Sequence, residues 1–326
     1  MPYIPIEESL KIGVLDDLSK MWDTEQEAAM ESRKKLFHDV PWVPQYESKF
    51  VWKQDTPMPV PWEKGTEIPA SVFDDVAIVC GVFPYGQRFE YFKWDAAMDQ
   101  IGDLKQHAES GIKRYSTLYR YFYADYFNGT TNYLFYPQLA YDGAALFSAN
   151  DGSGNDRMKV SGGNTMNATS LTTAGIKTDI HRAIQRWLGM KQPISGHPVF
   201  RPDEVTLDKI WCLIPPSLEE RFFDLAEARI LYTEPAINTA QSNTLVTKLR
   251  YQIDNLLTDS SDYYIVIEHP YWKPFIYRGV SSIESFLATA ANSDDARKLN
   301  IEAWFSNTMM GCCPWAMFTI IKVNVA

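Results

Sequence analysis

The stretch whose residue types most resemble a metal site is AYDGAALFSANDGSGND, which combines aspartates with two Asp-Gly pairs. Asp151, Ser153 and Asn155 stand at positions 1, 3 and 5 of a possible EF-hand calcium loop. Position 6 of such a loop must be Gly but is Asp156, and position 12 must be Glu but is Gly162. Aspartate beside glycine is otherwise a turn former. The pattern therefore predicts a turn rather than a metal site.

The other candidates for chemistry are an acid–base pair and the imidazole and thiol groups. Glu268 and His269 end an apolar run and would be the acid and base of a hydrolase. Adjacent residues of a strand point to opposite faces, which disfavours a shared site. No two of the five histidines lie at helix-face spacing, and Cys312-Cys313 lacks the two-residue spacer of a zinc site.

Nucleotide-binding and acyl-transfer motifs are missing as well. The sequence contains no G-x-x-x-x-G-K-[ST], no strand-borne G-x-G-x-x-G and no G-x-S-x-G. We therefore predict no catalytic residue, no cofactor-binding residue and no metal ligand, and a protein that is not an enzyme.

The composition predicts a folded chain with a large core. Its 326 residues are 45% hydrophobic and 14% aromatic. The formal net charge of −10 predicts no broad basic surface for nucleic acid. A signal peptide and an apolar run of about 18 residues are both missing, so we expect an unexported protein without membrane contact. The few scattered cysteines favour reduced thiols in a cytosol.

Two segments before residue 70 carry large apolar residues that need a covering surface. Residues 7–38 are predicted to form one long helix with a narrow apolar stripe. Residues 41–69 combine many prolines with three tryptophans, which excludes a helix and a central strand. Each segment would pack either on its own domain or on a neighbouring molecule. The candidate contact residues between subunits are Leu10, Val14, Leu18, Trp22, Trp42, Trp52 and Trp62.

The clearest helix in the sequence covers residues 95–126, where apolar residues recur at steps of three and four. Asp95 is its predicted N-cap, and Gly129 is part of a stop signal. A connector rich in Gly, Ser, Asn and Thr follows at residues 153–173. It leads to a second helix that ends near Gly189.

The rest of the chain is predicted to contain several strands and one more helix. Residues 209–214 are a buried-strand candidate that Pro215 ends. Ser217, with Glu220 three residues later, forms a capping box that predicts a helix start. Two further strands are separated by Pro270, and the C-terminal residues predict a final antiparallel pair. The fold class is therefore α+β.

The order of these segments resembles the major head subunit of Mu-like phages, a major capsid protein with the Hong Kong 97 (HK97) fold. The resemblance is carried by DAAMDQIGDLKQHAESGIKRYSTLYRYFYADYF, YDGAALFS, LIPPSLEERFFDLAEA, DYYIVIEHPYWKPFIYR and IEAWFSNTMMGCCPWAMFTIIKV, and it covers about residues 70–326. In that family a spine helix leads to a D-G-x-x-L-F turn. Here the turn is Asp142, Gly143, Leu146 and Phe147, and we expect the last two to face the core beneath the helix.

The resemblance implies an HK97-like α+β fold with five segments along the chain. These are an N-terminal arm helix at 1–40, an extended loop at 41–94, a peripheral domain with the spine helix at 95–171, an axial domain at 172–278 and C-terminal strands of the peripheral domain at 279–326. The extended loop would lie over a neighbouring subunit.

The function that the resemblance implies is self-assembly into the hexamers and pentamers of an icosahedral head. The head would enclose double-stranded DNA without sequence-specific binding and without a cofactor, and the acidic charge suits such a container. The implied partners are copies of the chain together with scaffolding, portal and decoration proteins. The implied location is the virion, after assembly in the cytoplasm of a bacterial host. With no assembly-protease motif in view, we expect no N-terminal cleavage.

Two other functions stay open at this stage. A hydrolase with Glu268 and His269 as acid and base would be a compact monomer or dimer with a pocket. Another virion structural protein, such as a tail protein, would form tubes or rings rather than closed shells.

Overall fold

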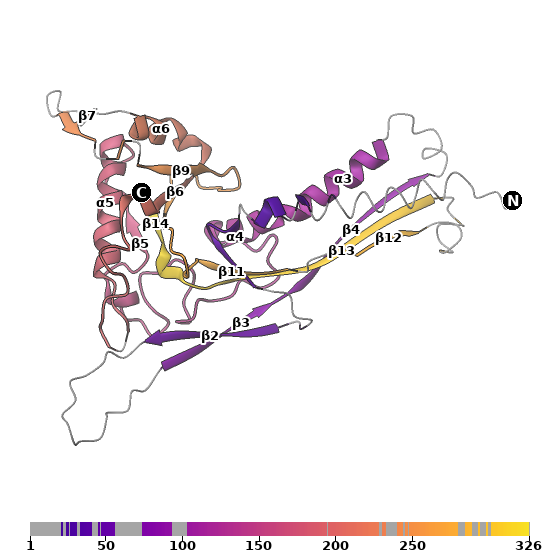
Figure 1. Cartoon of the computed structure of the whole chain (residues 1–326), viewed down its shortest axis with the longest axis horizontal. Helices are drawn as coiled ribbons and strands as arrows, with labels where there is room; N and C mark the ends of the chain where they lie inside the picture. Colours follow the sequence, from indigo (N-terminus) through magenta and orange to yellow (C-terminus); the bar gives the residue numbers. More distant parts are fainter. Residues whose placement is uncertain are drawn as a thin grey trace, which may run out of the picture.

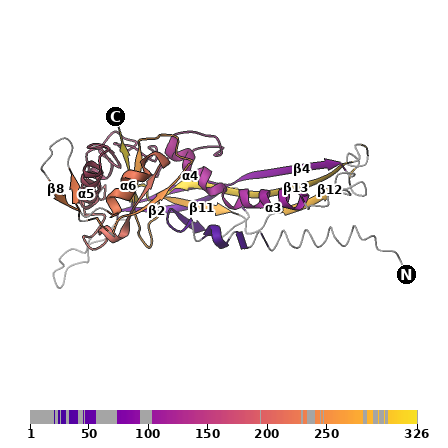
Figure 2. The same ribbon diagram turned by 90° about the horizontal axis from the view of Figure 1, so that it is seen from above.

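Two five-stranded sheets divide the chain between a long, narrow part and a broader part (Figure 1). The computed structural model describes residues 21, 24–25, 27–30, 33–40, 45, 47–55, 74–92, 103–193, 195–227, 230–232, 240–243, 245–246, 248–279, 284–288, 293, 298 and 301–325. Seen from above, the two parts lie end to end (Figure 2). Within the described residues, no helix has both the length and the apolar composition needed to span a bilayer.

The long sheet brings together strands from distant parts of the sequence. They are β1 (Phe37–Val40), β4 (Phe83–Phe92), β11 (Phe275–Gly279), β12 (Glu284–Ala288) and β13 (Ile301–Pro314). β13 is central: β4 pairs antiparallel with one edge, while β11 and β12 pair antiparallel with the other. β1 adds to β11 as a parallel strand.

The second sheet is the centre of the broad part. Its order is β5 (Thr165–Asn167), β14 (Ile320–Asn324), β10 (Tyr263–Ile267), β6 (Ile210–Ile214) and β9 (Arg250–Ile253). Every residue of β6 and β10 is buried, as expected for strands covered on both faces. The strand predicted at residues 209–214 is therefore confirmed.

The predicted antiparallel pair at the C-terminus is wrong, because its two strands belong to different sheets. β13 stays in the long sheet, and β14 pairs with β10 and β5. Between them the main chain of Trp315 and Ala316 donates to the carbonyls of Pro274 and Lys273 at 2.7 and 3.0 Å. These hydrogen bonds lie where the chain passes from the long sheet to the second sheet.

The long helix predicted at residues 95–126 is two helices, α3 (Asp103–Ser116) and α4 (Leu118–Asn128), which lie beside the long sheet (Figure 1). They meet at Thr117, whose hydroxyl donates to the carbonyls of Lys113 and Arg114, both at 3.1 Å. Ser and Thr hydroxyls that bond to preceding carbonyls commonly bend helices.

The predicted stop of the spine helix is confirmed. Gly129 has a φ of 65°, a left-handed conformation, and its N–H donates to the carbonyl of Asp125. The predicted N-cap, Asp95, lies outside the described residues.

The helix predicted at residues 7–38 ends earlier than expected. Residues 34–36 form a turn, and β1 starts at Phe37. The ring of Phe37 is buried, stacked on Phe275 at 5.3 Å and edge-on to Tyr119 at 5.7 Å. Burial of Phe37 among these rings outweighs the helix propensity of the residues before it. Most of the predicted helix lies outside the described residues.

A separate two-stranded ribbon precedes β4. β2 (Glu47–Asp55) and β3 (Asp74–Gly81) pair antiparallel, in line with the extended structure predicted for this region. The buried Arg278 of β11 ties the base of the ribbon to the long sheet, because its guanidinium donates to the carbonyls of Cys80 at 2.6 Å and Gln45 at 3.0 Å.

Two helices and a small strand pair complete the broad part. They are α5 (Thr173–Gly189), α6 (Glu219–Glu227), β7 (Ile230–Tyr232) and β8 (Ala240–Ser242). Both helices pack on the second sheet: Trp187 of α5 donates its indole N–H to the carbonyl of Phe318 at 2.8 Å, and Phe222 of α6 lies 5.4 Å from the ring of Tyr263. The predicted end of α5 near Gly189 is confirmed.

The capping box predicted at Ser217 is wrong. Ser217 lies inside a short 3₁₀ turn, Pro216–Leu218, and α6 begins only at Glu219. The Ser217 hydroxyl donates instead to the carbonyl of Ser260, so a tertiary contact takes the group that a cap would use.

Replacing Thr172 with alanine should lower the free energy of unfolding by about 1 kcal/mol, because Thr172 is the N-cap of α5. Its hydroxyl oxygen accepts the N–H of Gly175 at 3.1 Å. The matched control is Thr178→Ala, whose hydroxyl only returns to the carbonyl of Ala174 within the helix and should change stability by less than about 0.5 kcal/mol. Urea unfolding measures both, and equal losses would contradict a special role of the cap.

Candidate functional site

The turn predicted at Asp142-Gly143 is present. Gly143 has a φ of 76°, which side-chain-bearing residues rarely adopt, and the Asp142 carboxylate accepts the N–H two residues further on at 3.2 Å. Leu146 is buried, and Phe147 lies 5.6 Å from the ring of Phe127 in α4. The two apolar residues therefore face the core beneath the spine helix, as predicted.

Arg157, which the sequence did not single out, holds this turn in place. Its side chain is 1% exposed, and Nε and Nη2 donate to the two carboxylate oxygens of Asp142 at 2.6 and 2.7 Å. Nη1 donates to the carbonyl of Leu146 and to the side chain of Asn164, and Nη2 also donates to the carbonyl of Ala145. A buried ion pair persists only when its remaining hydrogen-bonding atoms are satisfied in this way.

The connector at residues 153–173 is anchored to distant parts of the chain. Asn164 is 1% exposed and donates to the carbonyls of Leu146 at 2.8 Å and Met317 at 3.1 Å. Further on, β5 pairs with β14. These anchors come from distant parts of the chain, and a composition rich in small polar residues gives no sign of them.

Asp151 forms a local turn, as the sequence predicted. Its Oδ1 accepts the N–H groups of Ser153 and Asn155, both at 2.9 Å. The small degree of burial disfavours the charged form, but the hydrogen bonds from Asn155 and Ser153 outweigh it, so the pKa of Asp151 is lowered. The carboxylate is thus used by its own loop.

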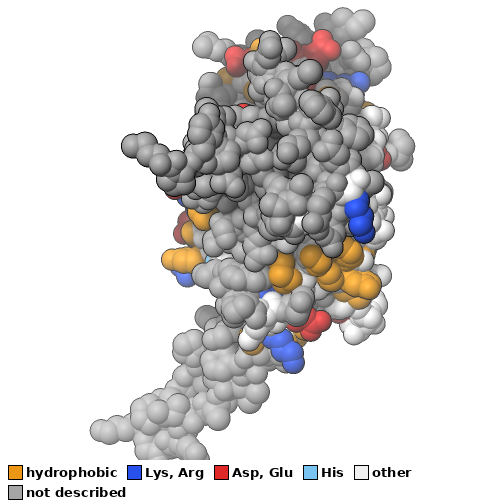
Figure 3. Space-filling view, turned by 90° about the vertical axis from the view of Figure 1, so that its right-hand side faces the viewer, with side chains coloured by type: hydrophobic (Ala, Val, Ile, Leu, Met, Phe, Trp, Pro, Cys, Tyr) orange, Lys and Arg blue, Asp and Glu red, His pale blue; other side chains and the backbone are white. Residues whose placement is uncertain are grey.

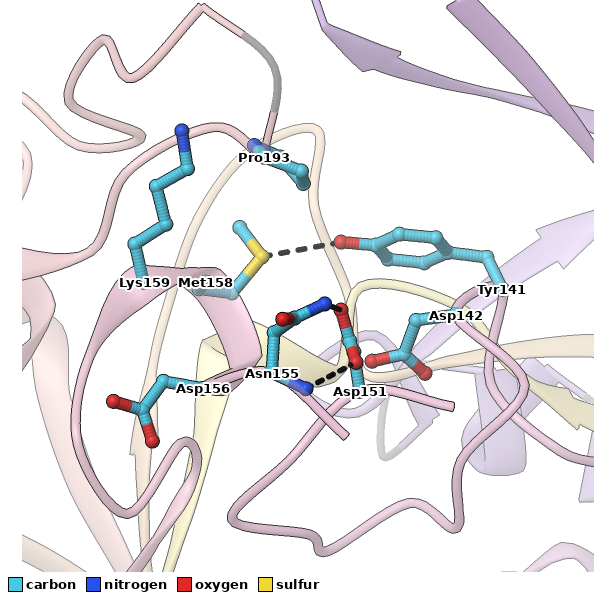
Figure 4. A pocket seen from close by; sticks show the side chains of 8 residues that line it. All are labelled: Tyr141, Asp142, Asp151, Asn155, Asp156, Met158, Lys159 and Pro193. Carbon is cyan, nitrogen blue, oxygen red and sulfur yellow. Dashed lines mark hydrogen bonds between the residues drawn. The ribbon is translucent and has the colours of Figure 1, made fainter. Parts of the chain in front are cut away.

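A cavity of about 520 Å³ lies beside this loop (Figure 4). It is lined by Tyr141, Asp142, Asp151, Asn155, Asp156, Met158, Lys159 and Pro193. The hydroxyl of Tyr141 donates to the sulfur of Met158 at 3.1 Å, while Asp156 points away from the other two aspartates (Figure 4). Across the described part of the chain, no three His, Cys, Asp or Glu residues are grouped as metal ligands. The lining residues also include no nucleophile beside a general base.

The structure separates the side chains of Glu268 and His269. Glu268 is partly exposed and pairs with Arg250 at 3.0 Å. His269 is 6% exposed, and its Nδ1 accepts the N–H groups of Tyr271 and Trp272 at 3.3 and 3.1 Å. Each candidate therefore has its own partners, and the two do not form a shared acid–base site.

The four cysteines carry free, buried thiols. Burial raises the pKa of Cys212, Cys312 and Cys313, and the neighbouring thiol of Cys80 adds to the rise for the last two. A buried, protonated thiol is a poor nucleophile, which fits a structural role for these residues.

The predicted contact residues between subunits stay predictions. Leu10, Val14, Leu18, Trp22, Trp42 and Trp62 lie outside the described residues. Trp52 is described only as a backbone position of β2, paired with Val76 of β3.

An exposed aromatic patch, absent from those predictions, lies where the loop after α4 meets the start of β4. Its members are Phe83, Phe135 and Tyr136. Phe135 is 54% exposed and Tyr136 is 69% exposed, and Phe83 lies 4.8 Å from the first ring and 5.7 Å from the second. The hydroxyl of Tyr85 fixes the loop by donating to the carbonyl of Tyr133 at 2.8 Å. The sequence signal was the run NYLFYPQL directly after a helix stop.

Apolar side chains also reach the surface on the face seen from the tip of the long sheet. Figure 3 shows a group of hydrophobic side chains there, bordered by a few basic and acidic ones. Apolar surface gathered in this way marks contacts with other macromolecules more often than isolated apolar residues do.

Comparison with known proteins finds similarity in structure but not in sequence. No protein-family model and no curated protein matches the chain. A chain from the capsid of an empty gene transfer agent (GTA) particle superposes with a TM-score of 0.58 at 9% identity, covering 90% of this chain and 89% of that one. A chain from the capsid of cyanophage P-SCSP1u gives 0.54 at 10% identity, covering 90% and 87%.

A third solved structure, from Microbacterium phage Oxtober96, gives a TM-score of 0.54 at 10% identity and covers 92% of this chain and 91% of that one. In all three comparisons the likeness covers at least nine tenths of this chain. The predicted α+β architecture is confirmed, and the chain has the HK97-like fold of phage capsid structures.

Proposed function

We propose that this chain is the major capsid subunit of a tailed phage, whose copies assemble into the hexamers and pentamers of an icosahedral head around double-stranded DNA. The observation that carries the proposal is the fold likeness to capsid chains, which spans 90% of this chain and 87–89% of theirs. The narrower assignment to Mu-like phages rests on the sequence motifs alone.

The two sheets suggest how the five proposed segments divide. The long sheet with α3 and α4 would be the peripheral domain, and the second sheet with α5 and α6 would be the axial domain. By strand pairing, β1, β4 and β11 would join the peripheral domain, and β5 and β14 would join the axial domain, which changes the segment boundaries given above. The residues before β1 remain the proposed arm.

Two surfaces support contacts between copies of the chain. The ribbon of β2 and β3 pairs with no further strand among the described residues, and isolated two-stranded ribbons are marginally stable in water. A neighbouring subunit beneath the ribbon would stabilise it. The aromatic patch offers a second apolar surface, and contacts of this kind hold symmetric assemblies together.

The proposal assigns a structural role in the virion, without catalysis. The acidic net charge suits a container that must not adhere to enclosed DNA. Assembly in the host cytoplasm, absence of N-terminal cleavage, and scaffolding, portal and decoration proteins as partners belong to the same proposal.

Negative-stain electron microscopy of the purified, full-length chain tests the function directly. We expect closed shells at concentrations and ionic strengths that favour assembly, because binding energy would be spread over many shared interfaces. Tubes or rings would point to a tail protein instead. A monodisperse monomer of 37.4 kDa under every assembly condition would contradict the proposal.

A further inference from the structure

The two sheets are joined where two crossing segments of the chain lie side by side. One segment, residues 268–274, leads from β10 to β11, and the other, residues 315–319, leads from β13 to β14. The main-chain N–H groups of Trp315 and Ala316 bond the second segment to the first at 2.7 and 3.0 Å. These two hydrogen bonds hold the crossing segments together.

Aromatic rings fill the junction. Trp272, on the first crossing segment, packs edge-on against Phe318 at 5.3 Å and against Phe200 at 5.7 Å. The imidazole of His269 stacks on the side chain of Trp272, with 4.4 Å between the ring centroids and an interplanar angle of 15°. His269 thus lies at the centre of the joint.

A single acceptor atom holds the turn of the first crossing segment. Nδ1 of His269 accepts the N–H of Tyr271 at 3.3 Å and that of Trp272 at 3.1 Å. An imidazole nitrogen that accepts hydrogen bonds carries no proton, so the ring proton of the neutral form is on Nε2. Nε2 faces the carboxylate of Glu204 at 3.8 Å. A second proton could be placed only on Nδ1, where two donors already point.

The charged groups around His269 shift its pKa in opposite directions. Burial lowers the pKa of His269, Glu204 raises it, and Lys273 and Lys209 lower it further; the net direction is downward from the ordinary value of 6.5. The folded state therefore binds this proton less readily than the unfolded state does. The contribution of neutral His269 to the free energy of unfolding is therefore complete above pH 6.5. It is lost as the pH falls through and below that value.

We propose that the stretch from His269 to Pro274 is an acid-operated hinge within the first crossing segment. Protonation of Nδ1 turns the acceptor into a donor, so the N–H groups of Tyr271 and Trp272 lose their partner and face a like donor. The turn of the crossing segment then opens. This inference goes beyond the proposed function and does not depend on it.

Hydrogen–deuterium exchange of the full-length protein, held in one assembly state, tests the hinge. Between about pH 7.5 and about pH 5.5 we expect the protection of the Tyr271 and Trp272 amides, corrected for intrinsic exchange, to fall roughly tenfold. The amides of Ile265 and Val266 in β10 should stay protected, because the opening is local. Unchanged protection of Tyr271 and Trp272, or an equal loss throughout β10, would overturn the proposal.

Two variants test whether the imidazole of His269 causes the pH dependence of the amide protection. In His269→Gln the side-chain carbonyl can accept the same N–H groups but does not titrate in this range, so the pH dependence should disappear. His197→Gln is the control, since His197 hydrogen-bonds through its main chain, and it should behave as the wild type. If His269→Gln kept the wild-type pH dependence, the hinge would be wrong.

A measurement on the wild type covers the case in which His269→Gln fails to fold. An NMR titration of the His269 ring gives the midpoint of its protonation. The hinge requires the amides of Tyr271 and Trp272 to lose protection with that same midpoint, and separate midpoints would overturn the proposal.

Discussion

Replacing Arg157 with methionine should lower the free energy of unfolding by about 3–5 kcal/mol. The substitution keeps an unbranched side chain about as long as the aliphatic part of arginine, but it leaves the Asp142 carboxylate buried without its partner. It also removes the donors to the carbonyls of Ala145 and Leu146, which hold the turn against the core. Urea unfolding of the unassembled subunit, followed by circular dichroism, measures the loss.

Arg182→Met is the matched control for this prediction. Arg182 also pairs with a buried carboxylate, that of Asp179 at 3.0 Å, but its own side chain is 43% exposed. Solvent already screens this pair, so the control should lose at most about 1 kcal/mol. If Arg157→Met and Arg182→Met were equally stable, the buried pair would not be the anchor of the turn.

Phe135→Asp should prevent shell assembly while leaving the subunit folded. Phe135 is 54% exposed, so the monomer loses little burial, whereas a partner would have to bury a carboxylate at the centre of the aromatic patch. The expected cost is at least about 2 kcal/mol at each contact, and a closed shell repeats that contact many times. Electron microscopy and sedimentation velocity measure assembly, and circular dichroism measures folding.

Phe223→Asp is the control for a general effect of an added negative charge on assembly. Phe223 lies on α6 and is 55% exposed, nearly the same as Phe135, but it belongs to the broad part of the molecule. We expect this variant to assemble as the wild type does. Assembly of Phe135→Asp at the wild-type concentration would remove the patch from the interface, and failure of both variants would show that the effect is not specific to it.

Features that depend on residues close together in the sequence were predicted correctly. The apolar residues Ile176, Ile180 and Trp187 recur at helical spacing, and all three are buried on one side of α5. Gly129 ends the spine helix because its left-handed conformation needs no distant partner. Turn chemistry placed Asp142 and Gly143 correctly for the same reason.

Features that depend on a contact with a residue far away in the sequence were missed or predicted wrongly. The hydroxyl of Ser217 has the pattern of a cap, yet it bonds to Ser260, 43 residues away. Arg157 has no local pattern that links it to Asp142, 15 residues earlier, so its role emerged only from the folded geometry. Phe135 and its neighbours looked like ordinary loop residues until β4 placed Phe83 beside them.

The placement of β13 and β14 affects how the protein is made. β13 is the central strand of the long sheet, β14 lies between β5 and β10 in the second sheet, and both follow the other strands of their sheets along the chain. Neither sheet can close while the ribosome still holds those residues, and pairing across such sequence separations is slow. A nascent chain therefore cannot present a finished surface to other copies before both strands have left the ribosome, and the proposed assembly would start only after that point.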